Sequence, residues 1–172
     1  ISLLSQSISK NSGHLTEGIA ETSSINLSLA GNYALSFGNI EVANWLFLVN
    51  GRINTTAGNM LTITNTHTNP VTGGSDASFV DGPLRKRIIA GQSFNFPVGN
   101  YNGAAAKPAR YGNILLSGVS ATNFWTAAYV NSDPEPPYTR SSLLSPITSV
   151  SDNEYWVVNR PAGNTANIRL RW

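Results

Sequence analysis

The chain has 172 residues, and only 12% of them are charged, with eleven basic and nine acidic side chains that leave a formal net charge of +2. It contains no cysteine, which excludes disulfides, thiol catalysis and cysteine metal sites. The small net charge gives no reason to expect a nucleic-acid partner. No run of apolar residues approaches the ~20 needed for a membrane span, so we expect no membrane insertion. Ser, Thr and Asn are in large excess, which predicts a surface of hydroxyl and amide groups.

The first third of the chain is punctuated by turn signals. Residues 1–24 mix apolar and polar positions and lack the basic region of a signal peptide, which predicts a processed product or one piece of a longer protein. Ile25, Leu27 and Leu29 then alternate with polar or small residues, as in a half-buried strand. Short apolar clusters recur up to residue 65, separated by Gly-Asn or Asn-Gly pairs at 31–32, 38–39, 50–51 and 58–59. This spacing predicts many short strands in a sandwich, a meander or the rungs of a β-helix.

The best-defined local feature lies at residues 79–99. Residues 84–89 and 93–96 are rich in strand formers and flank Ala90-Gly91-Gln92, which predicts a β-hairpin. The only basic run, residues 85–87, falls in the first of these strands, where alternation sends 85 and 87 to one face and 86 to the other. We therefore interpret the three as solvated strand or edge residues that discourage edge-to-edge pairing, rather than as a phosphate site.

The last third predicts strands at 113–116, 123–130, 154–159 and 166–172, the final one inside a sheet because Ile168, Leu170 and Trp172 share a face. Three prolines within 132–145 predict a surface crossover between sheets or an edge. The fold class is therefore all-β, a mainly antiparallel β-sandwich with β-helix-like short strands in its N-terminal part. We expect one unit over 1–172, with Gly/Asn-punctuated strands at 1–75 and an aromatic-rich sheet at 76–172.

Three motifs carry a resemblance to a known family: FVDGPLR at 79–85, FPVG at 96–99, and VSDNEYW at 150–156 followed by Asn159 and Arg160. In this order and rough spacing they resemble a segment of large surface proteins of Bacteroidota that are secreted by the type IX route and described as adhesin-like or gliding-associated. The resemblance covers about residues 45–172. It implies an extracellular or cell-surface location, with other modules or copies of the same surface protein as partners. Residues 107–111 depart from the usual strand, and no type IX sorting domain is present, which favours one module of a longer chain.

Residues that could carry catalysis or bind a metal are few. His14 and His67 lie in turn-like polar sequence without a nucleophile elbow, which favours surface histidines. Four carboxylates are the candidates for a glycosidase pair or a calcium site: Asp133, Glu135, Asp152 and Glu154. We favour the interpretation that all four carboxylates make capping and turn hydrogen bonds. We therefore expect no cofactor, and a bound calcium ion is the alternative.

Aromatic residues are the remaining candidates, because exposed rings stack on sugars. Most of them alternate with apolar neighbours, which predicts core packing for Trp45, Trp125, Tyr129, Tyr155, Trp156 and Trp172. Tyr101, Tyr111 and Tyr138 sit in or beside loops and are the candidate ligand-binding residues. The function we expect is a non-catalytic structural or adhesive module of a bacterial surface protein. The alternative is a carbohydrate-binding module for surface glycans, and a glycoside hydrolase comes third. In a tandem array, residues 1–8 could pair with the sheet edge of a neighbour.

Overall fold

The computed structural model describes residues 6–7, 21–35, 38–101 and 108–171. They form strands joined by turns and loops, with no helix among them, which confirms an all-β chain. The described part therefore also contains no helix with the length and apolar character needed to cross a membrane. His14, Trp172 and most of residues 1–8 lie outside the described residues.

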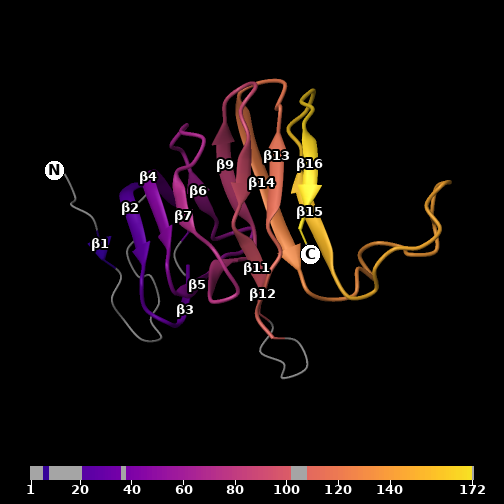
Figure 1. Ribbon diagram of the computed structural model, residues 1–172, viewed down its shortest axis with the longest axis horizontal. Coiled ribbons are helices and arrows are strands. Elements are labelled where there is room, and N and C mark those ends of the chain that lie inside the picture. The colour runs from indigo at the N-terminus through magenta and orange to yellow at the C-terminus, as the bar shows by residue number, and fades with distance from the viewer. Residues whose placement is uncertain (1–5, 8–20, 36–37, 102–107, 172) are drawn as a thin grey trace.

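The strands of the described residues form three sheets (Figure 1). The largest has the order β1 (Gln6–Ser7), β2 (Glu21–Leu27), β4 (Ile40–Leu48), β6 (Leu61–Ile63), β9 (Leu84–Ile88), β14 (Asn123–Val130) and β15 (Tyr155–Asn159), with β7 (Val71–Gly73) also paired to β4. The second has the order β12 (Arg110–Tyr111), β11 (Val98–Asn100), β8 (Ser78–Asp81), β5 (Gly51–Asn54) and β3 (Asn32–Ala34). The third contains β10 (Phe94–Phe96), β13 (Ile114–Ser117) and β16 (Asn167–Leu170).

With the exception of β10, the strands up to β11 wind as a β-solenoid-like stack. Neighbouring strands are parallel, and each residue pairs with one on the next turn of the chain, as Ile53 does with Val80 and Val80 with Val98. Gly51 shows why glycine occupies a corner: its φ is +96°, and a Cβ there would lie 2.4 Å from the Leu29 carbonyl oxygen. The Gly/Asn pairs that predict turns are thus the corners of successive rungs, the β-helix-like arrangement expected for the N-terminal part.

The expectation of a mainly antiparallel sandwich does not match this arrangement. Eight of the thirteen strand pairings in the described residues are parallel, and the five antiparallel ones all involve β12, β13, β14, β15 or β16. The sheets are therefore mixed, with a parallel stack closed by antiparallel strands.

The predicted hairpin at 84–96 is wrong. β9 pairs with β6 and β14, whereas β10 pairs with β13 in another sheet. The turn itself exists, since the Gln92 N–H donates to the Ile89 carbonyl at 3.0 Å and Gly91 has φ +79°. It is a corner that carries the chain from one sheet to the next rather than back along β9.

Two expectations for the C-terminal part also need correction. β16 pairs only with β13 among the described strands, so it is an edge strand, and Ile168 is exposed. The proline-rich segment connects β14 to β15, which are antiparallel neighbours in one sheet, so it is no crossover between sheets. In Figure 1 this segment extends away from the strands as an arm.

The core fills the space between the sheets with inward-facing side chains from every rung, including Ile25, Leu46, Ile63 and Leu84. Tyr155 is only half-buried and is not part of the core, contrary to the prediction, whereas Trp125 and Tyr129 belong to the core as predicted and Trp156 packs against it. Trp45 does not: it is 39% exposed on β4, because Val42, Leu46 and Leu48 occupy the inward positions of that strand.

Candidate functional site

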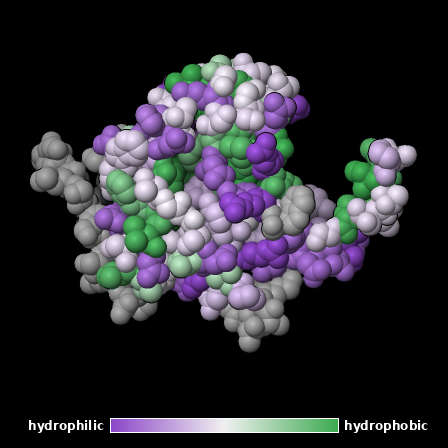
Figure 2. Space-filling view, viewed as in Figure 1, coloured by the Kyte–Doolittle hydropathy of each residue, from purple (hydrophilic) through white to green (hydrophobic). Residues whose placement is uncertain are grey.

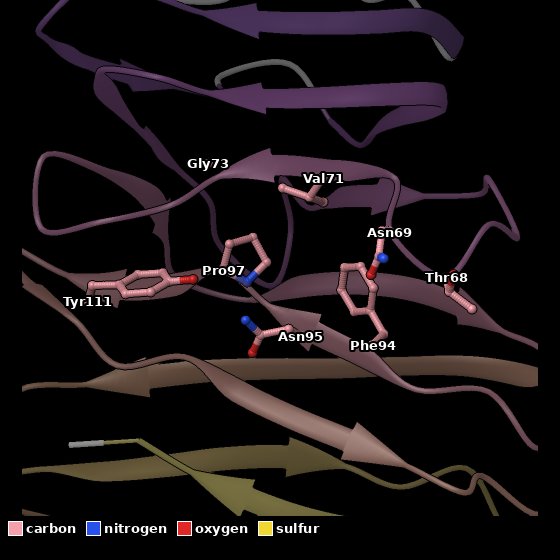
Figure 3. Close-up of a pocket in the computed structure, with 8 residues that line it drawn as sticks. All are labelled: Thr68, Asn69, Val71, Gly73, Phe94, Asn95, Pro97 and Tyr111. Carbon is pink, nitrogen blue, oxygen red and sulfur yellow. The ribbon is translucent and has the colours of Figure 1, made fainter.

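A cavity of about 140 Å³ lies between β7 and the strands β10 to β12 (Figure 3). Its polar lining comes from Thr68, Asn69, Asn95 and Tyr111, and its less polar lining from Val71, Gly73, Phe94 and Pro97. None of these eight residues is charged. The Phe94 ring is held by a T-shaped contact with Phe96, with ring centroids 4.8 Å apart.

The glycine pair that ends β7 brings the chain close to Tyr111. Gly73 has φ +89°, and a Cβ there would lie 2.1 Å from the Leu48 carbonyl oxygen. At Gly74, with φ +103°, a Cβ would lie 2.8 Å from the Tyr111 hydroxyl oxygen. Only glycine permits both the backbone conformation and this close approach, which brings Gly74 against Tyr111 next to the cavity-lining Gly73.

Tyr111 is fixed at both its backbone and its ring. Its N–H donates to the Asp76 carboxylate at 2.7 Å. Burial raises the pKa of the Tyr111 phenol, with smaller opposing effects from the Asn113 amide and the Arg171 charge, so the hydroxyl is a proton donor at neutral pH. Asn113 in turn donates from Nδ2 to Asn95 Oδ1 at 3.0 Å, which orients the Asn95 amide.

The other two candidate tyrosines lie elsewhere. Tyr101 follows β11, with the Arg52 guanidinium 4.0 Å from its ring centroid and its N–H donating to Asp81 at 3.0 Å. Burial raises the pKa of Asp81, opposed by that bond and by one from Asn100. Tyr138, 51% exposed on the arm, contacts the Tyr155 ring edge to face. The structure thus does not bring the three tyrosines together at one site, and of the three only Tyr111 lines the cavity.

The four candidate carboxylates are divided between separate interactions. Asp133 and Glu135 both contact Arg140, each at 3.2 Å, within the arm. Asp152 accepts a hydrogen bond from Asn153. Glu154 accepts from Tyr129 at 2.6 Å and pairs with Arg110 at 3.3 Å. Among the described residues, no three His, Cys, Asp or Glu side chains gather as a metal site would require.

The Glu154 cluster ties the closing strands together. Burial, followed by the Glu154 carboxylate, raises the pKa of Tyr129 well above its usual range. A Cβ at Gly112 would lie 2.3 Å from the Tyr129 ring, and the Gly112 carbonyl accepts from Trp156 Nε1 at 2.9 Å. These contacts link the end of β12 to β14 and β15, so the cluster is explained by packing.

Lys86 contradicts the interpretation of the basic triplet as solvated. Its side chain is 1% exposed, because β9 is flanked on both sides and alternation places residue 86 inward with Leu84 and Ile88. The ammonium donates to the carbonyls of Asn65 and Arg87 and lies 5.3 Å from the Phe94 ring centroid. Burial, with a smaller effect of Arg87, lowers the pKa of Lys86 to about 8.

Arg85 and Arg87 are exposed on the other face of β9, as alternation predicts, and the Arg85 guanidinium lies 4.4 Å from the Phe124 ring centroid. The basic triplet is therefore divided between the two faces of a central strand. It provides no continuous basic surface.

Sequence reasoning misses most of the cavity. It predicts a hairpin over Phe94 and Asn95 and only a loop over residues 65–75. The sequence does contain one usable signal. The number of residues between Leu61 and its partner Leu84 is the same as the number between Val71 and Phe94. This equal spacing would have placed β7 and β10 next to each other.

Comparison with known proteins gives no relative. No protein-family model matches the sequence, and neither the curated proteins nor the solved structures provide a significant match. The class that the structure defines is an all-β protein with mixed sheets and a β-solenoid-like arrangement.

Proposed function

We propose that the chain is a non-catalytic structural or adhesive module of a bacterial cell-surface or extracellular protein. The supporting observation is the parallel stack, in which β1, β2, β4, β6 and β9 run side by side, with β3, β5, β8 and β11 as a second such sheet. Each rung is joined to the next by backbone hydrogen bonds, so the sheet faces are extended and stiff. Such a scaffold acts by presenting a surface.

The surface it presents is suited to contact with neutral partners. In Figure 2, hydrophilic and hydrophobic residues are interspersed over one face of the molecule. Exposed side chains such as Asn26 and Trp45 lie on the outer face of the largest sheet. Other modules, further copies of the chain and surface glycans are the partners that we propose, within the type IX-secreted surface proteins of Bacteroidota that the motifs resemble.

Surface display tests this proposal. The chain would be fused between a secretion signal and a cell-wall anchor, and cell attachment to glass and to glycan-coated wells would be counted against cells displaying an unrelated β-domain of similar size. We expect the chain to increase attachment and Leu46→Glu, which places a charge in the core, to abolish the increase. Attachment no greater than that of the cells displaying the unrelated domain would contradict an adhesive role.

A further inference from the structure

We propose that the cavity between β7 and β10 binds one neutral sugar ring of a glycan. This inference rests on the adhesive part of the proposed function and names the class of its ligand. It is carried by a gap in the strand stack, by the backbone groups that the gap exposes, and by the chemistry of its walls.

The gap is a missing strand pairing. Leu61 pairs with Leu84 and Ile63 with Lys86, at one constant separation along the chain. The same separation would pair Val71 with Phe94, yet in the described residues β7 pairs only with β4, and β10 only with β13. The free edge of β7 and the free edge of β10 therefore border the cavity (Figure 3).

The edge of β7 offers backbone groups to a ligand. The Pro70 carbonyl accepts from Leu46, and the Gly74 N–H donates to Leu48, so these positions face β4. Backbone groups alternate in direction along a parallel strand, which turns the N–H and C=O of Val71 and Gly73 away from β4. Both residues line the cavity, so a bound molecule meets donors and acceptors on this side.

The side chains complete a wall for a hydroxyl-rich, uncharged ligand. Asn69 and Asn95 are exposed amides at the mouth, and the Tyr111 hydroxyl lies at the end next to Gly74. Phe94 and Pro97 give an apolar face (Figure 3). Sugar rings combine an apolar face with hydroxyls that both donate and accept, which matches these walls. The absence of charged groups from the lining favours a neutral sugar.

The size of the cavity limits the ligand to one ring. Pockets for drug-sized molecules enclose about 300–1,000 Å³, whereas this cavity encloses about 140 Å³. An inserted peptide strand would run the length of both edges, and β7 and β10 are only three residues long. We therefore favour a terminal or side-branch sugar over an extended peptide.

The test is ligand-observed saturation-transfer NMR on the full 172-residue chain. The probes are the methyl glycosides of glucose, galactose, mannose and N-acetylglucosamine, with trialanine as the peptide probe. We expect at least one glycoside to bind with a Kd of about 1 mM. Asn69→Ala and Tyr111→Phe should each weaken that binding about tenfold, because each removes one hydrogen-bonding group from the wall.

Two variants serve as matched controls. Asn26→Ala removes an exposed amide on β2, and Tyr138→Phe removes an exposed phenol on the arm. Both should leave the glycoside Kd unchanged. Circular dichroism and thermal unfolding verify that all four variants fold.

Three results would overturn the inference: no glycoside signal at about 10 mM, glycoside binding that Asn69→Ala and Tyr111→Phe leave intact, or binding of trialanine alone. Surface attachment by displayed cells that persists in Asn69→Ala and Tyr111→Phe, with no glycoside bound in solution, would refute the sugar site and leave the adhesive module standing.

Discussion

The parallel stack, formed by β1 to β9 and β11, and the closing strands β12 to β16 are held together differently. In the stack, short corners return the chain to the next rung, and the interior is a set of aligned apolar rows such as Ile25, Leu46 and Val71. The closing strands are antiparallel, and a long connection, 131–154, which includes the proline-rich arm, separates β14 from β15. Side-chain hydrogen bonds occur in both regions, such as Arg52 to Asn32 in the stack and Tyr129 to Glu154 in the closing strands. The regular rungs thus depend on parallel pairing and aligned apolar rows, whereas their closure depends on antiparallel pairing.

The largest expected effects come from truncating one buried leucine in each region. Leu46 on β4 and Leu116 on β13 are both fully buried. Leu46→Ala and Leu116→Ala should each lower the free energy of unfolding by about 2–5 kcal/mol, because each loses apolar contacts and leaves a cavity. Urea unfolding measures both.

The exposed Ile168 on β16 supplies the control, since Ile168→Ala should change the free energy of unfolding by less than about 1 kcal/mol. If the two regions form one cooperative unit, either leucine variant shifts a single transition. Two transitions, each shifted by only one variant, would show that the stack and its closing strands unfold separately.

An intermediate effect is expected from the buried amine at the boundary of the two regions, where β9 of the stack pairs with β14. The pKa of Lys86 is about 8 in the folded protein, whereas the ordinary lysine pKa, which we take for the unfolded chain, is 10.5. Between these values the unfolded chain binds the proton and the folded chain does not, so stability rises with pH. The rise should amount to about 2–3 kcal/mol across this pH window.

Lys86→Met retains the length of the side chain and removes the titrating group. Comparison of urea unfolding of the original chain and Lys86→Met across this pH range isolates the contribution of Lys86 from that of other groups. The same slope in both proteins would mean that the two carbonyl acceptors keep the ammonium charged in the fold.

The smallest expected effect tests the polar ties of the closing strands. Tyr129→Phe removes the bond to Glu154 and keeps the ring, so the free energy of unfolding should fall by about 1–2 kcal/mol. Tyr138→Phe, on the exposed arm, is the matched control and should have no measurable effect. Equal stability of the two variants would show that Arg110 alone satisfies Glu154.

The strand faces can be predicted from the sequence, whereas the strand partners cannot. Alternation assigns Leu84, Lys86 and Ile88 to one face and Arg85 and Arg87 to the other, as observed. The corner before β10 has the same local signal as a hairpin turn. The partners of β9 are β6, a full turn of the chain upstream, and β14, further downstream, and local turn chemistry carries no information on either pairing.

The candidate site is predictable only in part for a related reason. Tyr111 stands out because it lies beside a loop, but Asn69 and Asn95 gain meaning only when β7 and β10 meet. The apolar neighbours of Trp45 predict a core position, although alternation from Val42 and Leu46 already indicates the outer face. The signal at Trp45 is therefore local, whereas for the two asparagines it lies only in the spacing along the chain that relates Val71 to Phe94.

The short edge strands at the closed end have a consequence for behaviour at high concentration. A long, flat edge is a template on which another chain can add a strand, and natural proteins avoid such edges. Here β12 has two residues and β16 has four, with Arg110 in the first and the exposed Arg169 in the second. These two edges offer few unpaired groups, and Arg169 adds an exposed positive charge to β16, whereas Arg110 is paired with Glu154. The strands β12 and β16 should therefore be poor templates for an added strand even though the surface carries little charge.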